Sequence, residues 1–168
     1  AILIGVSALL VAVAAFAPAI PQDPAFHLFA DIRLLCGVPR FGDVVSNIPF
    51  TLVGLAGMWG VTGARSRRLF ERPGDGLPYR VFFAAVAMIG LGSGYYHWEP
   101  NTERLFWDRL PMTVAFMAFF ATFIFFVLSM LPVGFVSPAV STNASIGFLH
   151  EAVPVVLSFF ACAQARAS

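Results

Sequence analysis

Charged residues are scarce in this chain of 168 residues, and lysine is missing altogether. Only 11% of the residues are charged, whereas soluble domains average roughly 25%. This deficit argues against a soluble globular protein, a disordered chain and a nucleic-acid-binding protein. In their place the chain has 59% hydrophobic residues and a mean hydropathy of +0.83. The composition therefore predicts an integral membrane protein.

Cysteine is also rare. Cys36 and Cys162 are isolated in the sequence and form no Cys-x-x-Cys motif. A disulfide scaffold, a zinc finger and a dithiol redox motif are therefore excluded. The sequence leaves open whether these two thiols pair.

Long apolar runs predict an all-α, polytopic transmembrane helix bundle, because a backbone in lipid must satisfy its own hydrogen bonds. We expect a single transmembrane domain over residues 1–168, with four helices at 1–20, 44–62, 81–96 and 110–131. A fifth run, 144–163, is interrupted by His150, Glu151 and Pro154. A cleaved signal peptide is the alternative for residues 1–20, but its apolar core would be only about 7–15 residues long. A retained helix is therefore favoured.

Arginine is concentrated between the second and third predicted helices. Residues 63–80 contain five of the ten arginines and two acidic residues. The positive-inside rule places this loop in the cytoplasm. The connector from His97 to Asp108 then lies on the extracytoplasmic side.

Ionisable residues inside or beside membrane segments are often functional. Ser93 and His97 are four residues apart, so they share one face at the end of a predicted helix. Asp108 begins the next helix, which packs antiparallel to the first, so His97 and Asp108 are expected to face each other across the helix pair. A histidine ligand, a carboxylate base and a hydroxyl suit a metal-assisted hydrolase.

Two structural interpretations compete with this chemistry. The aromatic side chains around His97 could form an interfacial belt, made of Tyr95, Tyr96, Trp98 and Trp107. Asp108 could simply cap the fourth helix, with Pro111 in its first turn. His27 has no partner at a useful spacing and is expected to be a surface or interfacial residue.

A family resemblance favours the hydrolase. Ser93-x-x-x-His97, the eleven residues to Asp108 and the Leu-Pro-Met ending at Met112 resemble the alkaline ceramidase family, within the CREST superfamily of membrane hydrolases. The upstream stretch Ala30-Asp-Ile-Arg33, followed by Gly37-Val-Pro-Arg-Phe-Gly-Asp-Val-Val-Ser-Asn-Ile-Pro-Phe50, resembles the entry to an early helix of bacterial members. The resemblance covers roughly residues 29–120.

The resemblance implies a membrane protein of seven helices with a zinc site, which hydrolyses the amide bond of ceramide-type membrane lipids. His97 would then be a zinc ligand, and Asp108 would be the general base for the zinc-bound water. Ser93 would hydrogen-bond at the site and stabilise the tetrahedral intermediate. Ser46 and Asn47 match a motif that we interpret as structural. The resemblance to bacterial members of the family, and the use of arginine without lysine, favour a bacterial inner membrane.

The chain departs from the family pattern in two respects. The family's His-x-x-x-His pair on a late helix has no counterpart among the three histidines, and His150 is only a weak candidate for an additional ligand. We therefore expect an incomplete copy, whose sequence after about residue 121 is truncated, frameshifted or divergent. The alternative function is a non-catalytic lipid-binding or receptor-like membrane protein on the same scaffold.

Calcium is not predicted. The nearby acidic residues are Asp23, Asp31 and Asp43, and Arg40 occupies the position expected for an acidic ligand.

Overall fold

The structure is a computed structural model that describes residues 23–72 and 74–130. It also describes seven residues outside these ranges: Leu9, Ala12, Val13, Phe16, Ile146, Gly147 and His150. These seven are helical, while the rest of the predicted helices at 1–20 and 144–163 lies outside the described residues. The described chain is mainly helical, as expected from the composition.

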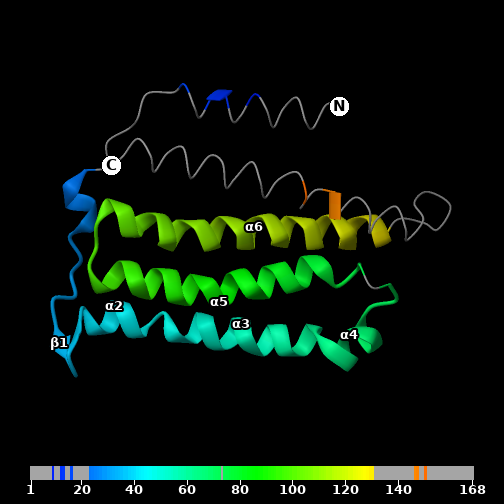
Figure 1. The fold of residues 1–168 in the computed structure, drawn as a ribbon, viewed down its shortest axis with the longest axis horizontal. Helices are drawn as coiled ribbons and strands as arrows, with labels where there is room; N and C mark the ends of the chain where they lie inside the picture. Colours follow the sequence, from blue (N-terminus) through cyan, green and yellow to red (C-terminus); the bar gives the residue numbers. More distant parts are fainter. Residues whose placement is uncertain are drawn as a thin grey trace.

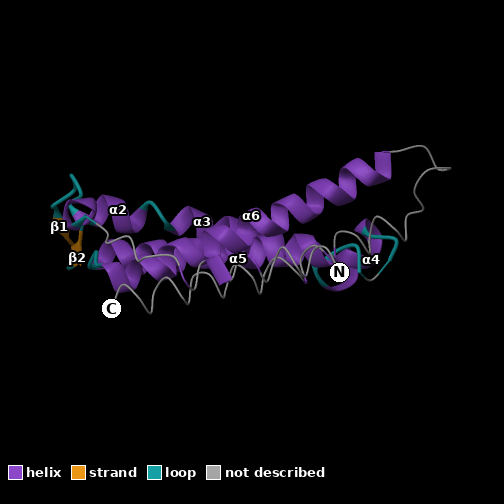
Figure 2. Cartoon of the chain, turned by 90° about the horizontal axis from the view of Figure 1, so that it is seen from above, coloured by secondary structure: helices purple, strands orange, loops and turns teal. Residues whose placement is uncertain are grey.

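Three long helices lie side by side in the order α3, α5, α6 (Figure 1). They are α3 (Ile48–Val61), α5 (Leu77–Trp98) and α6 (Thr102–Met130), and α5 packs against both of the others. Figure 2 shows the last part of α6 extending away from the other two helices. The spans Phe41–Val61, Leu77–Trp98 and Thr102–Leu128 are long and apolar enough to cross a membrane. This finding is consistent with an integral membrane protein.

The helices begin earlier than the apolar runs predicted. α5 starts at Leu77 rather than residue 81, because Pro78 suits a first helical turn and the polar side chain of Arg80 does not stop the helix. α6 starts at Thr102 rather than residue 110, and its first turns are polar. The connector between them is therefore much shorter than the predicted 97–108.

The second predicted helix is divided in two. α2 (Phe41–Val45) ends before Ser46 and Asn47, and α3 begins at Ile48. Pro49 lies in the first turn of α3 and has no N–H to continue the hydrogen-bond ladder back into α2. Asn47 instead donates its side-chain amide to the Asp43 carbonyl oxygen at 2.7 Å. This bond is local, to the end of α2, whereas a structural role through a bond across helices was expected for Asn47.

The predicted linker and the predicted arginine loop both contain ordered elements. Residues 23–40, here called the N-terminal segment, hold the 3-10 helix η1 (Pro24–His27) and a hairpin of β1 (Leu34–Leu35) and β2 (Val38–Pro39). Cys36 and Gly37 form its two-residue turn with φ of 52° and 77°, which is the backbone that such a tight hairpin needs. The arginine loop contains α4 (Gly63–Leu69).

Small residues let α3 approach α5 closely. Gly54 is buried and faces the backbone of Ala87, and Gly90 lies against Thr51 and the Asn47 carbonyl. Thr51 donates a hydrogen bond to the Ala87 carbonyl at 3.2 Å. Such close backbone contacts are typical of helix pairs in membranes. Gly54 therefore allows close contact between α3 and α5.

Candidate active site

The structure brings Ser93 and Asp108 together between α5 and α6. The Ser93 hydroxyl donates a hydrogen bond to Oδ1 of Asp108. Ser93 is 4% exposed and Asp108 is 8% exposed, so this pair is shielded from solvent. A carboxylate in such a place is costly unless it is hydrogen-bonded. Ser93, which shares a helix face with His97, is therefore the residue of α5 that meets Asp108 across the helix pair. The expected approach of His97 to Asp108 stays a prediction.

Close contact between the two backbones positions this pair. Gly92 faces the Trp107 carbonyl oxygen so closely that an added Cβ would overlap it. Trp107 is four residues before Pro111, which lies inside α6 and has no N–H to donate to that carbonyl. The Trp107 carbonyl oxygen is therefore left to face the Cα of Gly92. Cα–H···O contacts of this kind recur between closely packed helices.

Asp108 is not a helix cap. α6 begins at Thr102, so Asp108 lies in its second turn, with Pro111 in the helix interior. The capping interpretation is therefore wrong. The backbone N–H of Arg104 is instead accepted by the side chain of Asn101, just before the helix, at 2.8 Å. Asp108 directs its carboxylate to a neighbouring helix, which leaves it available for chemistry between helices.

His97 lies one helical turn beyond Ser93. It is half-buried, and its Nδ1 atom is buried without a hydrogen-bond partner among the described residues. Its ring lies 4.7 Å from the ring of Phe29 and 5.2 Å from that of Tyr96, measured between centroids. A buried imidazole nitrogen without a partner is suited to accept a hydrogen bond or to bind a metal ion.

Tyr96 does not belong to the expected aromatic belt. It is only 2% exposed, whereas Tyr95 is 49% exposed and Trp98 and Trp107 are similarly open. The Tyr96 hydroxyl is 2.9 Å from Nδ1 of His27, and the other ring nitrogen of His27 is 3.3 Å from the Thr102 hydroxyl. The belt interpretation therefore stays a prediction for the three exposed residues, and the burial of Tyr96 argues against it for that residue.

His27 joins the N-terminal segment to α5 and α6, which the sequence did not indicate. It comes from η1 in the N-terminal segment, and it is half-buried rather than a simple surface residue. Its two partners are 69 and 75 residues away in the sequence, so no local spacing could have revealed them. Together with Phe29, it holds the N-terminal segment over the end of α5 that carries His97.

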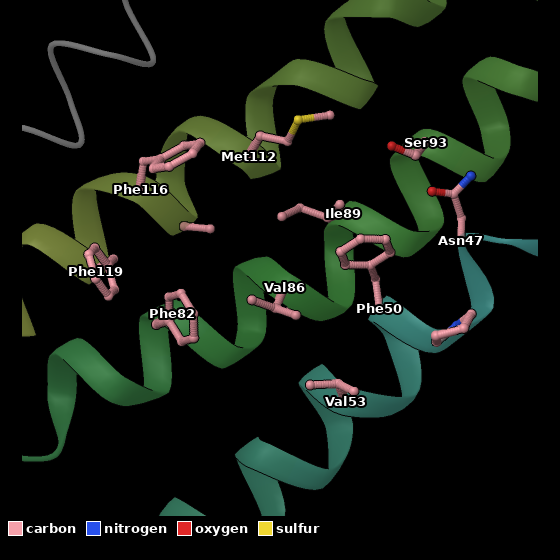
Figure 3. Close-up of a pocket in the computed structure, with 12 residues that line it drawn as sticks. Asn47, Phe50, Val53, Phe82, Val86, Ile89, Ser93, Met112, Phe116 and Phe119 are labelled. Carbon is pink, nitrogen blue, oxygen red and sulfur yellow. The ribbon is translucent and has the colours of Figure 1, made fainter.

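An apolar cavity of about 730 Å³ lies beside the Ser93–Asp108 pair, between α3, α5 and α6. Figure 3 shows Ser93 and Asn47 together at one end, and Phe82 and Phe119 at the other. The remaining lining is almost entirely apolar: Pro49, Phe50, Val53, Val86, Ile89, Met112, Ala115 and Phe116. A cavity with one polar end and a long apolar remainder suits an amphiphilic molecule.

The donor set fits zinc only in part. Nδ1 of His97 has the chemistry and the burial of a ligand, and the Asp108 carboxylate lies on the neighbouring helix. Among the described residues, no group of three or more His, Cys, Asp or Glu side chains could hold a metal ion. A catalytic zinc ion needs about three protein ligands. His150, the weaker candidate, is helical and exposed.

Two of the three acidic residues of the N-terminal region, Asp23 and Asp31, form structural hydrogen bonds. Asp31 accepts hydrogen bonds from the Arg33 side chain at 2.6 Å and from the Gly42 N–H at 2.7 Å. The hydrogen bond from Arg33 is the main reason why the pKa of Asp31 lies well below its usual range. Asp23 caps η1 through the Ala25 N–H. Arg40 donates to the Trp98 carbonyl at 3.3 Å, which joins this region to the end of α5.

Comparisons with protein-family models, with curated proteins and with solved structures give no match to this chain. The ceramidase resemblance therefore stays a prediction from the residues quoted above.

Proposed function

We propose that this chain belongs to a ceramidase-like, zinc-dependent membrane hydrolase that cleaves the amide bond of ceramide-type lipids. The observation that carries the proposal is the buried Ser93–Asp108 hydrogen bond, whose donor Ser93 lines the polar end of the apolar cavity. Ceramide has the matching chemistry, with a polar amide head and long hydrocarbon chains. Its chains would lie along the Phe82 and Phe119 end, and its amide would lie near Ser93.

Each residue has a defined part in this proposal. Asp108 accepts a proton from water, and the oxygen of that water attacks the amide carbonyl carbon. In the structure the Ser93 hydroxyl donates its one hydrogen to Asp108. As Asp108 takes up the proton, this hydroxyl would turn to donate to the carbonyl oxygen and stabilise the negative charge that develops there. The proton then goes to the amide nitrogen as the C–N bond breaks. The products are a fatty acid and a sphingoid base.

His97 would be one zinc ligand through its imidazole nitrogen. When bound, zinc would lower the pKa of water and polarise the carbonyl. The described residues do not supply its remaining ligands. Phe29 and Tyr96 pack against the His97 ring and hold its orientation.

The proposed location is a bacterial inner membrane, with residues 63–80 in the cytoplasm and the His97–Asp108 end on the extracytoplasmic side. The arginine content of residues 63–80 supports this orientation. The substrate would then enter the cavity from the surrounding lipid.

The test is the release of fatty acid from ceramide by the full-length protein in detergent. We expect Asp108→Asn and His97→Ala each to lower turnover by about 10²–10⁴-fold, the range of a general acid–base contribution. Glu99→Gln is the matched carboxylate control, because Glu99 is exposed and pairs with Arg104 at 2.7 Å. It should retain turnover. Activity that survives both Asp108→Asn and His97→Ala would overturn the mechanism.

One observation favours a second candidate, a non-catalytic lipid-binding or receptor-like protein. Over the part of the chain that the structure describes, the metal-ligand set is incomplete. This candidate predicts saturable binding of ceramide that His97→Ala barely changes, and no stoichiometric zinc. One zinc ion per full-length chain, measured by elemental analysis, would contradict it.

A further inference from the structure

A second pocket lies at the opposite end of α5 from Ser93. It has a volume of about 570 Å³ and is formed by α4, the following loop and the start of α5. Its lining includes three basic residues, Arg67, Arg72 and Arg80, and one acidic residue, Glu71. The Ser66 side chain adds a hydroxyl. The pocket is therefore positive and rich in hydrogen-bond donors.

This pocket lies where two apolar spans end. The span that includes α3 ends at Val61, and the span of α5 begins at Leu77. The residues between them are therefore at the level where a bilayer changes from hydrocarbon to headgroups. Anionic lipid phosphates concentrate at this level, and basic side chains there attract them.

The arginines of this region divide into two groups. Arg67 and Arg72 line the pocket, whereas Arg65 lies 3.5 Å over the ring of Trp59 and Arg68 is exposed outside the lining. The loop that carries Arg72 is fixed by its backbone N–H, which donates to Asp75 at 3.2 Å. The pair Arg67 and Arg72 lines the pocket, and the pair Arg65 and Arg68 has the same charge but lies outside the lining.

One wall of the pocket is held by aromatic packing. The ring of Phe70 lies 5.2 Å from that of Tyr79, and Gly76 leaves room for the Phe70 ring beside the loop. This packing ties the end of α4 to the first turn of α5. The guanidinium groups are therefore carried by backbone that the fold keeps together.

We propose that this pocket binds an anionic phosphate group, presented by a lipid headgroup of the surrounding leaflet. Planar guanidinium groups bind phosphate oxygens through paired, charge-assisted hydrogen bonds. The Ser66 hydroxyl is a further donor to the same group. This site is independent of the proposed hydrolase, since it shares no lining residue with the cavity beside Ser93.

The experiment uses the full chain in neutral detergent, mixed with dioleoyl phosphatidylglycerol or dioleoyl phosphatidylcholine, with retained lipid counted by native mass spectrometry. Inorganic phosphate alone is tested by equilibrium dialysis. The pocket variant is Arg67→Gln with Arg72→Gln, and the matched control is Arg65→Gln with Arg68→Gln. Both double variants remove the same charge from the same segment.

We expect the retention of phosphatidylglycerol by the pocket variant to fall about 10–30-fold, because each interfacial arginine contributes about 1 kcal/mol of binding free energy. The control variant should retain most of the phosphatidylglycerol that the unmodified chain binds. The unmodified chain and both variants should retain phosphatidylcholine only weakly. Glu71→Gln removes the opposing carboxylate and should raise retention of phosphatidylglycerol, which provides a test even where the double variant folds poorly.

Retention of phosphatidylglycerol that depends on the pocket pair supports the lipid headgroup. Binding of inorganic phosphate that depends on this pair, without lipid retention, overturns the lipid source and assigns the site to a soluble phosphate. Equal losses in the two double variants would mean diffuse charge attraction and would overturn the site altogether. So would a failure of the unmodified chain to prefer phosphatidylglycerol.

Discussion

The contact between α5 and α6 and the attachment of the N-terminal segment are built in different ways. α5 and α6 meet through direct backbone approach at Gly92 and a buried hydrogen bond between Ser93 and Asp108. The N-terminal segment is joined to α5 and α6 by a few polar bonds and ring contacts, chiefly those of His27 and Phe29. One region depends on close packing that tolerates no added atom. The other depends on single interactions that can be lost one at a time.

This difference separates the positions where a small change should have a large effect from those where it should not. In the first region, shape and burial determine the energy of the contact, so a single methyl group matters. In the second region, each polar bond contributes modestly and water can replace part of it. The substitutions below test whether the two regions respond in this order.

The largest effect is expected from Gly92→Ala. The added Cβ would overlap the Trp107 carbonyl oxygen, and a backbone atom cannot rotate away. We expect this change to lower the free energy of unfolding by about 3 kcal/mol, the upper part of the range for overpacking. Thermal unfolding in detergent, followed by circular dichroism, measures it.

Gly94→Ala is the matched control for this prediction, two residues along the same helix. Its added Cβ would meet no atom within 4 Å. Replacing glycine with alanine inside a helix then stabilises by about 0.5–1 kcal/mol. Equal shifts of the two variants, in either direction, would contradict the close approach of α5 and α6.

A smaller loss is expected from Ser93→Ala. It removes a hydrogen bond to a buried carboxylate and should cost about 1.5–3 kcal/mol. Thr113→Ala is the control, because the Thr113 hydroxyl donates to the Arg109 carbonyl within its own helix at 2.9 Å. The same unfolding assay compares them. A Ser93→Ala variant as stable as Thr113→Ala would show that the Ser93–Asp108 bond contributes little to the pairing of the helices.

The first region was largely predictable from the sequence. The apolar runs predicted the helices. The positions of His97 and Asp108 predicted that this end of α5 faces the start of α6, where Ser93 rather than His97 donates to Asp108. The helix starts were misplaced, since polar residues such as Arg80 and Glu103 belong to first turns that carry no apolar signal. The closeness of the backbones at Gly92 was not predictable, because it depends on the position of the Trp107 carbonyl in the neighbouring helix.

The N-terminal segment was not predictable in the same way. His27 acts through Tyr96 and Thr102, which lie far away in the sequence, and polar linker residues follow no helical or strand period. The two-residue hairpin turn at Cys36 and Gly37 contains only one glycine to indicate its positive φ values. Long-range polar contacts of this kind require the three-dimensional structure.

Tyr96→Phe tests the junction between the two regions. It removes the hydroxyl that meets Nδ1 of His27 and should cost about 1 kcal/mol. The loss should appear as faster hydrogen exchange of the amides in residues 25–29, with the α6 amides unchanged. Tyr95→Phe is the control, since that ring is half exposed. Faster exchange throughout α5 and α6 would mean that Tyr96 supports the helix pair itself rather than the N-terminal segment.

The smallest effect on stability is expected from the hydrogen bonds that Asp31 accepts from Arg33 and Gly42, and this effect depends on pH. Its pKa is lowered from the ordinary value of 3.8, first because Arg33 donates a side-chain hydrogen bond to the carboxylate. A lowered folded-state pKa means that the stabilisation is fully present above pH 3.8 and is lost as the pH falls below it toward the folded value. The unfolding temperature of the unmodified chain should therefore fall in acid more steeply than that of Asp31→Asn. Arg33→Gln should remove most of this difference, because it eliminates the main cause of the shift. Identical acid profiles for all three forms would mean that the ion pair is screened by solvent, and that the Gly42 N–H alone fixes this end of the segment.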